Sequence, residues 1–290
     1  KIITQYGSYN TYCFDDLGLE PTGRFYGKDA NVMAEVMLSR YEYYRKCNRQ
    51  KYFFKRKVAH FTTNLNASEI EKRLDLRCTI DNDANLAALG SARFGVAKPF
   101  DSFIMITLGT GVGGGTIYEN KIYRGTTGSA GELGHVIIDY HGPISNSNTR
   151  GGIEAYLGQR FLSRLAVDLI TQQPDNPLYK EFHHDFSLLE PVDLTRAANK
   201  GNDLAIDVLR KSGEKLGYAI VNYIHILDIR KIVVSGGVAK AGKWILNPAK
   251  ETAKKLLMPP FLDGFDVIYE SLGNEAALLG AASLAFEELS

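Results

Sequence analysis

Three things are scarce in this sequence: cysteine, long apolar runs and an excess of charge of one sign. The three cysteines among its 290 residues, Cys13, Cys47 and Cys78, lie far apart. This odd, sparse count argues against a disulfide framework, and no pair has metal-ligand spacing, so we expect a reducing cytoplasm. No stretch of about 18 apolar residues exists, which argues against a membrane-spanning helix. The opening letters KIITQYGSYN contain no apolar core of a signal peptide, and we expect none.

The charges nearly cancel, because 34 Lys and Arg face 33 Asp and Glu, a formal net charge of +1. This balance gives no global reason to bind nucleic acid or an acidic membrane. The exception is the run 45–57, which carries seven positive charges, no negative ones and three aromatic rings. Aromatic stacking between cations suits nucleic acid, yet no recognition motif accompanies the run. We favour a solvated helix end and loop there, and expect no nucleic-acid or membrane partner.

Glycine, by contrast, is clustered. Five of the 28 glycines fall between residues 109 and 115, directly after an apolar strand candidate at 103–108. No Gly-Lys-Ser/Thr follows, so this is not a Walker A loop, and no helix follows, so it is not a dinucleotide-binding fingerprint. Two interpretations stay open. The cluster is either a turn whose backbone N–H groups and Thr110 hydroxyl face an anion, or a structural β-hairpin.

Strand and helix candidates alternate along the chain, which is typical of an α/β protein. The strand candidates are 1–6, 77–80, 103–108, 136–139, 231–234 and 266–270, with a hairpin about 119–120. The helix candidates are 29–47, 83–94, 153–170, 203–226, 244–257 and 275–288, and 171–190 is predicted to be a surface excursion. Glycine turns at 109 and 236 each follow a buried strand candidate, and ligands in such folds bind at the carboxyl ends of strands. We therefore expect a nucleotide held between two lobes.

A run of polar side chains, Asp81-Asn-Asp-Ala-Asn85, lies where a strand candidate ends and a helix candidate begins. A carboxylate there is placed to accept a proton from a hydroxyl as a general base. Asp and Asn are also preferred at helix N-caps, so a purely structural cap is the alternative.

Glu132 and His135 are three residues apart, so a helical turn would put both on one face. Together with Glu154 they suggest a polyol pocket, because carboxylates and imidazoles hydrogen-bond well with sugar hydroxyls. A purely structural histidine is the alternative.

In this order the motifs resemble the ROK family (repressors, open reading frames and sugar kinases), which lies within the actin-like, hexokinase-type ATPases. The resemblance begins at Thr62 and rests on segments 62–65, 81–90, 108–115, 131–135, 150–158, 235–238 and 273–277. It implies a two-lobed α/β fold of the actin-like ATPase (ribonuclease H-like) class. The small lobe would span 1–105, with the helix 275–290 packing back on it, and the large lobe would span 106–274.

The resemblance also implies an ATP-dependent hexose kinase, glucokinase-like, that uses Mg²⁺ and phosphorylates the 6-hydroxyl with Asp83 as general base. Alternative sugars are an N-acylhexosamine or fructose, and a homodimer is implied. The residues matching the family's sugar contacts are Thr63, Asn64, Asn82, Asp83, Glu132, His135 and Glu154. Those matching its ATP contacts are Gly7, Gly109, Thr110, Gly111, Gly113, Ser235, Gly236, Gly237 and Asn274.

The sequence departs from the family at its zinc motif. Three cysteines of that motif correspond to Ser145, Ser147 and Gly152 here, and only His135 remains. One imidazole does not make a tetrahedral structural site, so we expect no zinc. The loop would then be held by ordinary hydrogen bonds and packing.

The second departure concerns the family's first phosphate loop, Asp-x-Gly-Gly-Thr. The equivalent stretch is Gln5-Tyr-Gly-Ser-Tyr9, which keeps only Gly7. Either the active site is impaired or residues 1–60 are not faithfully represented, and the well-formed later motifs favour the second explanation. Two non-enzymatic alternatives stay open. One is a sugar-sensing repressor, for which no DNA-reading module fits this sequence, and the other is a nucleotide-binding scaffold without turnover.

Overall fold

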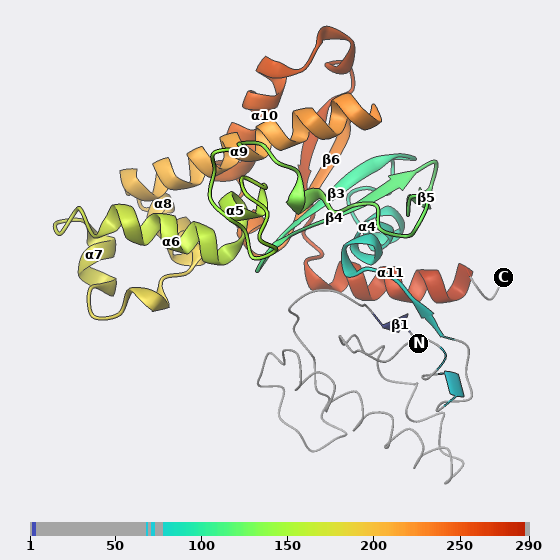
Figure 1. The fold of residues 1–290 in the computed structure, drawn as a ribbon, viewed down its shortest axis with the longest axis horizontal. Coiled ribbons are helices and arrows are strands. Elements are labelled where there is room, and N and C mark those ends of the chain that lie inside the picture. The colour runs from blue at the N-terminus through green and yellow to red at the C-terminus, as the bar shows by residue number, and fades with distance from the viewer. Residues whose placement is uncertain (1, 4–67, 69–70, 73–77, 288–290) are drawn as a thin grey trace. The chain divides into compact units, whose positions relative to one another are not determined.

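The computed structural model of the chain describes residues 2–3, 68, 71–72 and 78–287. These residues belong to two compact units, 1–93 with 274–290 and 94–273. Figure 1 labels their helices and strands. Several predicted features lie outside the described residues: Gly7 and its phosphate loop, Thr63, Asn64, the helix at 29–47 and the basic run at 45–57.

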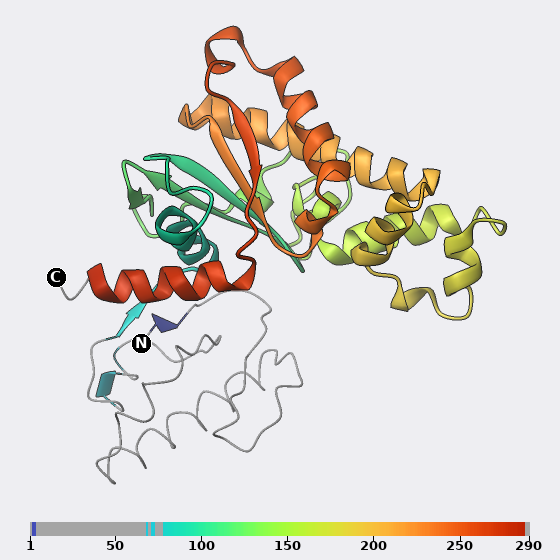
Figure 2. The same cartoon turned by 180° about the vertical axis from the view of Figure 1, so that it is seen from behind.

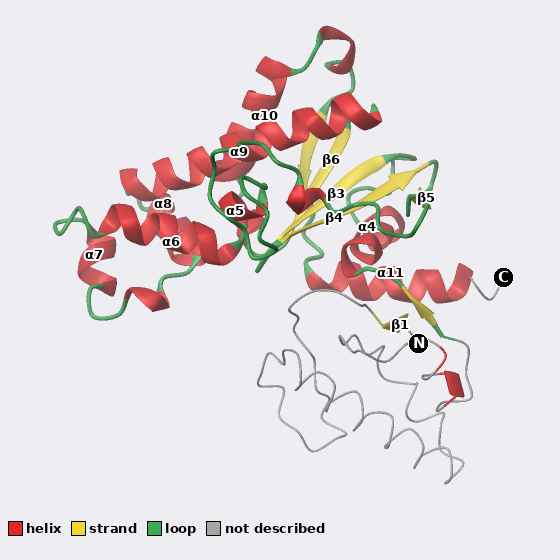
Figure 3. Ribbon diagram, viewed as in Figure 1, coloured by secondary structure: helices red, strands yellow, loops and turns green. Residues whose placement is uncertain are grey.

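The unit 94–273 is built on a five-stranded mixed sheet in the order β5-β4-β3-β6-β7. Its strands are β3 (Phe103–Leu108), β4 (Val112–Tyr118), β5 (Lys121–Ile122), β6 (Lys231–Ser235) and β7 (Asp266–Tyr269). The first three form an antiparallel meander, whereas β6 runs parallel to β3 and β7 parallel to β6. The strands are yellow in Figure 3. Because β3 and β6 are parallel neighbours, their carboxyl ends meet at one edge of the sheet.

The β4–β5 hairpin turns at Glu119 and Asn120, as the sequence predicts. Both residues have a positive φ, 49° and 64°, which two-residue hairpin turns require and which Asn tolerates well. The preceding strand is longer than expected. It begins at Val112, not at Thr116, and pairs in unbroken register from Leu108↔Val112 to Phe103↔Ile117. Most of the glycine cluster is therefore strand, and the turn is confined to 109–111.

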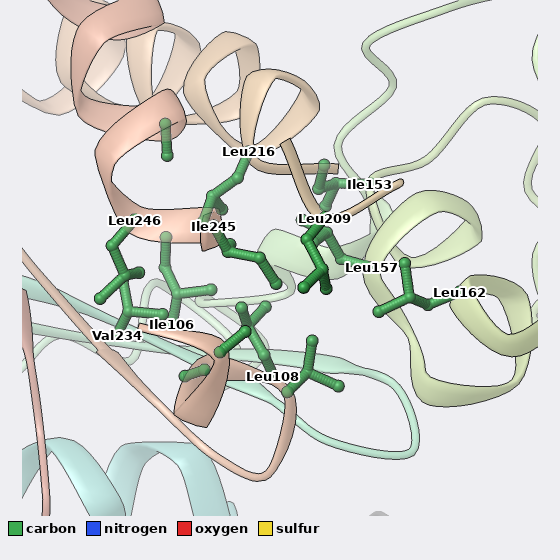
Figure 4. Packing of buried hydrophobic residues seen from close by; sticks show 14 of the residues in the cluster. Ile106, Leu108, Ile153, Leu157, Leu162, Leu209, Leu216, Val234, Ile245 and Leu246 are labelled. Carbon is green, nitrogen blue, oxygen red and sulfur yellow. The ribbon is translucent and has the colours of Figure 1, made fainter. Parts of the chain in front are cut away.

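Two long helices, α9 (Asp203–Leu227) and α10 (Lys243–Leu256), pack against one another and against the sheet. Figures 1 and 2 show them side by side. Glycines on α9 let the backbones approach, since a Cβ at Gly217 would lie 2.7 Å from the Ala249 carbonyl oxygen. Figure 4 shows the core between sheet and helices, with labelled side chains that include Ile106, Leu108 and Val234 from strands and Leu209, Leu216 and Ile245 from helices. Burying each such side chain contributes roughly 1.5–3 kcal/mol.

Two predictions for this unit, a helix at 153–170 and a strand at 136–139, are wrong. The single helix predicted at 153–170 is two helices, α5 (Glu154–Leu157) and α6 (Gln159–Ile170), because Gly158 is extended, with φ −61° and ψ 140°. The strand predicted at 136–139 is only an isolated bridge between Ile137 and Gly152.

The predicted excursion at 171–190 carries α7 (Pro177–Phe182) and the 3₁₀ turn η3 (Phe186–Leu188), and α8 (Pro191–Asn199) follows. Further 3₁₀ turns are η2 (Leu133–His135), η4 (Val238–Ala241) and η5 (Pro259–Phe261). No helix within the described part of the chain is long and apolar enough to cross a membrane.

Glu270 is buried (1% exposed), and its carboxylate accepts hydrogen bonds from backbone groups near both ends of this unit. It accepts the Val96 N–H at 3.0 Å and the Leu272 N–H at 2.9 Å. A Cβ at Gly95 would collide with this carboxylate, which explains the glycine. The residues through which the chain enters and leaves the unit are thus tied to one side chain.

In the other unit, β1 (Ile2–Ile3) pairs in parallel with β2 (Thr79–Ile80), and α4 (Asp83–Phe94) lies against α11 (Asn274–Glu287). The two helices touch backbone to backbone. A Cβ at Gly90 would overlap the Ala276 carbonyl oxygen, and one at Gly280 would overlap the Leu86 carbonyl oxygen. Both glycines are therefore required by the close helix crossing.

Candidate active site

The turn between β3 and β4 consists of Gly109, Thr110 and Gly111. It is closed by the Gly109 N–H, which donates to the Gly111 carbonyl at 3.0 Å. The start of α6 supports it, since the Gln159 N–H donates to the Gly109 carbonyl at 2.9 Å. A trans peptide points its N–H opposite to its carbonyl, so this bond directs the Thr110 N–H away from α6. The two interpretations of the glycine cluster, a structural β-hairpin and a turn that faces an anion, are therefore compatible.

Glu154, the first residue of α5, lies directly against this turn. Its side chain is 9% exposed, and its Oε2 accepts the Val112 N–H at 3.3 Å. A Cβ at Gly111 would collide with the same oxygen. The glycine at 111 is thus explained by the approach of a carboxylate, and a predicted sugar contact lies beside a predicted phosphate contact.

Glu132 and His135 lie on one short turn, as their spacing predicts. The His135 Nε2 and the Glu132 Oε2 are 3.5 Å apart across η2. Tyr223 of α9 anchors this turn from the core, because its hydroxyl donates to the Leu133 carbonyl at 2.7 Å in a buried hydrogen bond. Burial raises the pKa of the Tyr223 phenol far above its usual 10.0, so the hydroxyl keeps its proton and remains a donor.

A cluster of hydroxyl groups, Ser145, Ser147 and Thr149, meets the other nitrogen of His135 through Ser147. The Ser147 Oγ lies 3.3 Å from the His135 Nδ1, 2.8 Å from the Ser145 Oγ and 3.2 Å from the Thr149 Oγ1. Serine and threonine hydroxyls are poor zinc ligands compared with cysteine thiolate and histidine imidazole. Among the described residues no three His, Cys, Asp or Glu side chains are placed to hold a metal ion. The residues present here do not fit the family's zinc, and hydrogen bonds occupy its place.

The loop that carries this hydroxyl cluster is fastened by Tyr156 and Asp139. The Tyr156 hydroxyl donates to the Asp139 Oδ2 at 2.8 Å, and the Lys215 ammonium lies 4.7 Å from the centre of the Tyr156 ring. Burial, then the hydrogen bond to Asp139 and its charge, raise the pKa of Tyr156 to about 12. The same hydrogen bond, with a further one from the His141 N–H, lowers the pKa of Asp139. The pair therefore stays a neutral donor and a charged acceptor near neutral pH.

The second glycine turn, Ser235-Gly236-Gly237, follows β6 at the same edge of the sheet as the first. Thr107 pairs with Ser235, and Gly236, whose φ is 100°, passes so close to β3 that a Cβ would collide with the Leu108 carbonyl. Two of the predicted ATP-binding segments therefore meet at the carboxyl ends of neighbouring parallel strands.

Asp83 is the first residue of α4 in the other unit, and it takes part in the cap of that helix. The Ala84 N–H donates both to the Asn82 Oδ1 at 2.8 Å and to the Asp83 Oδ1 at 2.9 Å. Asp81, which is buried, accepts the Asn85 amide at 2.9 Å and braces the segment from behind. The predicted cap is therefore present, and the half-buried Asp83 carboxylate is part of it. Asn274 begins α11 of the same unit.

Several residues that shape the site were not found from the sequence. Tyr223 and Tyr156 looked like ordinary helix residues, and their partners lie 90 and 17 positions away in the chain. Thr149 carried no signal. Ser145 and Ser147 were noticed only because they stand at cysteine positions of the family, and no local pattern showed that Ser147 contacts His135.

Comparisons with known proteins identify the family. The model of the ROK family matches residues 50–288. The chain is 30% identical to a glucokinase from Thermotoga maritima over 221 residues, which covers 76% of this chain and 69% of that protein. It is 28% identical to a xylose repressor from Bacillus spizizenii, covering 78% of this chain and 56% of the repressor.

Among solved structures, the ROK family glucokinase from Streptomyces griseus in complex with glucose and AMPPNP superposes with a TM-score of 0.70 at 31% identity. The match covers 78% of this chain and 74% of that one. The likeness confirms the predicted α/β fold of the actin-like ATPase class. Because the family model spans residues 50–288, and because relatives were found both by sequence and by structure, the chain belongs to the ROK family.

Proposed function

We propose that the protein transfers the γ-phosphoryl group of ATP to the 6-hydroxyl of a hexose, with glucose as the first candidate. The observation that carries this proposal is the placement of Glu154. Its buried carboxylate lies on the Gly111–Val112 backbone of the turn that would hold phosphate. The related glucokinase from Streptomyces griseus holds glucose and an ATP analogue, which supports the same pair of ligands here.

In the proposed reaction, the Asp83 carboxylate takes the proton of the sugar hydroxyl. The hydroxyl oxygen forms a bond to the γ-phosphorus while the bond to the β-phosphate oxygen breaks, and ADP leaves. Phosphoryl transfer depends mainly on positioning and charge neutralisation. Mg²⁺, when bound to the nucleotide, would supply much of that neutralisation. It is usually held by phosphates, water and only one or two carboxylates, so the site needs no cage of protein ligands.

The remaining roles follow the family motifs. We assign contacts with the sugar hydroxyls to a set of polar side chains: Thr63, Asn64, Asn82, Glu132, His135 and Glu154. We assign ATP to the two glycine turns at 109–113 and 235–237, with Gly7 and Asn274 as further contacts. We also propose a homodimer in the cytoplasm, with a small lobe over 1–105 and helix 275–290 and a large lobe over 106–274.

A second candidate is a sugar-binding protein that does not catalyse. Its support is the similarity to a xylose repressor and the departure of Gln5–Tyr9 from the family's phosphate loop. A scaffold that binds nucleotide without turnover is supported by the departure of Gln5–Tyr9 alone. In either case sugar or nucleotide would bind, and no sugar phosphate would form.

A coupled assay that follows ADP release separates these candidates. The full chain would be given ATP, Mg²⁺ and, in turn, glucose, N-acetylglucosamine, N-acetylmannosamine and fructose. We expect turnover with at least one sugar, and none without sugar. Saturable sugar binding by calorimetry without any turnover would favour the sensor. Nucleotide binding alone would favour the scaffold.

A further inference from the structure

Two buried polar residues, Asp81 and Asn85, flank Asp83 in the sequence and are bonded to each other. We propose that they are a pair of positioning residues for the proposed reaction. Asn85 orients the Asp81 carboxylate, and Asp81 holds the backbone that presents Asp83 to the sugar hydroxyl. The inference rests on the proposed function, because it takes Asp83 as the general base.

The bonds of this pair converge on one atom. The Asp81 Oδ1 accepts the Asn82 N–H at 2.8 Å and the Asn85 Nδ2 at 2.9 Å. The first bond holds the peptide that leads into Asp83, and the second comes from the first turn of α4. On the other side of Asp83, the Ala84 N–H is held by the Oδ1 atoms of the capping residues. Asp83 therefore lies between two anchored amides.

Capping alone does not account for this arrangement. Asn82 is the N-cap of α4, because its side chain accepts the Ala84 N–H and its carbonyl accepts the Leu86 N–H at 3.0 Å. In an ordinary capping box, the third helical residue carries an acceptor that takes the N–H of the N-cap. Here that N–H goes to Asp81, and the third helical residue, Asn85, donates to the same oxygen. Two buried polar side chains are present where a capping box uses one.

Asn85 also carries a cost that a helix residue with a purely structural role would avoid. Its side chain is 2% exposed, and within the described part of the chain its Oδ1 has no hydrogen-bond partner. A buried acceptor without a donor lowers stability, and Asn is a weaker helix former than Ala. The next four residues, 86–89, are apolar and buried. The useful part of Asn85 is its amide nitrogen, which is bound to Asp81.

A carboxylate that removes a proton must be placed accurately, since a misplacement of about 1 Å can lower a rate about 100-fold. Loss of either partner loosens the hold on the Asn82 N–H, so Asp83 would occupy a wider range of positions. Several proposed sugar contacts, among them Glu132, His135 and Glu154, come from other elements. We therefore expect the chemical step to slow while sugar binding changes little.

The test compares Asn85→Ala and Asp81→Ala with a control, Ser283→Ala. The control removes the hydrogen bond from the buried Ser283 hydroxyl to the Leu279 carbonyl in α11 of the same unit. For each full-length variant we would measure kcat with the best sugar, the dissociation constant of that sugar by calorimetry, and unfolding in urea. We expect the first two variants to lose kcat by about tenfold or more and to keep their affinity for sugar. Ser283→Ala should keep both.

Two further variants separate positioning from a general loss of structure. Because the pair acts as one unit, the double variant Asp81→Ala/Asn85→Ala should lose no more kcat than the worse single variant. Asp81→Asn keeps an oxygen that accepts from both amides, so it should restore most of the kcat that Asp81→Ala loses.

Four outcomes would each overturn the proposal. They are wild-type kcat in Asn85→Ala, a loss of sugar affinity in Asn85→Ala as large as its loss of kcat, additive losses in the double variant, and a loss in Asp81→Asn as large as that in Asp81→Ala. If Asp81→Ala does not fold, Asn85→Ala decides the question by itself. These outcomes leave the kinase assignment intact, whereas a wild-type chain that phosphorylates no sugar would remove the proposed function, and this inference with it.

Discussion

At the scale of single residues, Tyr223 shows how one buried polar group fixes a functional turn. Its hydroxyl reaches 90 positions along the chain to the Leu133 carbonyl, between Glu132 and His135. The η2 turn also packs against β4, and this hydrogen bond ties its backbone to α9. A buried carbonyl that loses its donor costs the protein about 1–3 kcal/mol.

We therefore expect Tyr223→Phe to lower the free energy of unfolding by about 1–3 kcal/mol and to raise the KM for sugar, with kcat changed less. Urea denaturation and steady-state kinetics measure the two effects. The control is Tyr218→Phe, which removes an exposed hydroxyl from the same helix. Equal effects of the two substitutions would show that the buried bond does not anchor the turn.

The same tyrosine predicts a dependence on pH. Burial raises the folded-state pKa of Tyr223 above the value of 10.0 expected when unfolded. A raised folded-state pKa means that its stabilisation is complete below about pH 10 and is lost as the pH rises further. The stability gap between wild type and Tyr223→Phe should therefore be constant from neutral pH to about pH 9 and narrow above pH 10. A difference in unfolding free energy between the two proteins that grows above pH 10 would contradict this prediction.

At the scale of elements, the loop 135–152 brings a cluster of hydroxyl groups to His135. Ser147 contacts the His135 Nδ1 while Glu132 faces the Nε2. The imidazole ring of His135 thus has a carboxylate beside its Nε2 and a hydroxyl beside its Nδ1. The hydroxyl cluster and Glu132 together hold the orientation of the His135 ring.

We expect Ser147→Ala to raise the KM for sugar about two- to tenfold, the worth of one hydrogen bond, and Ser147→Thr to restore it. Asn146→Ala, an exposed neighbour in the same loop, should change nothing. Activity should also survive a zinc-selective chelator when magnesium is in excess, and elemental analysis should find no stoichiometric zinc. Inactivation by the chelator, reversed by added zinc, would contradict this account.

The packing of α9 on α10 can be tested with a glycine substitution, in which a gain in helix propensity opposes a steric clash between the helices. Replacing a helix glycine with alanine normally stabilises by about 1 kcal/mol. At Gly213, however, a Cβ would collide with the Ile245 carbonyl oxygen of α10, and overpacking costs about 1–3 kcal/mol. We expect Gly213→Ala to melt at a lower temperature than wild type. A higher melting temperature would mean that the helices separate easily at this crossing.

At the scale of the whole molecule, periodicity predicted most elements, and the resemblance of the ordered motifs predicted the family. Strong apolar patterns located β3, β6, α9 and α10 to within a residue or two. The errors lie where a contact outweighs the local pattern. Apolar residues continue at helical spacing on both sides of Gly158, so the sequence predicted one helix. The structure breaks the helix at Gly158, which packs against the 109–111 turn. The glycines of β4 looked like loop because their strand is defined by its partner β3.

The candidate site was predicted less completely, because it depends on long-range partners. The order of motifs identified Asp83, Glu132, His135 and Glu154. No sequence pattern showed that the Val112 amide bonds to Glu154 or that Ser147 reaches His135. Their chain separations of 42 and 12 residues are bridged only by the fold.

The central claim is that Asp83 removes the proton from the sugar hydroxyl, and a matched pair of substitutions tests it directly. Asp83 and Asp203 are both first-turn acidic residues that follow an Asn cap, at the start of α4 and of α9. The measurement is the rate of sugar-phosphate formation with the best sugar for wild type, Asp83→Asn and Asp203→Asn, with sugar affinity determined by calorimetry. We predict that Asp83→Asn loses turnover by at least about 100-fold while it keeps its affinity for sugar, and that Asp203→Asn behaves as wild type. An Asp83→Asn protein that turns over at the wild-type rate would contradict the account.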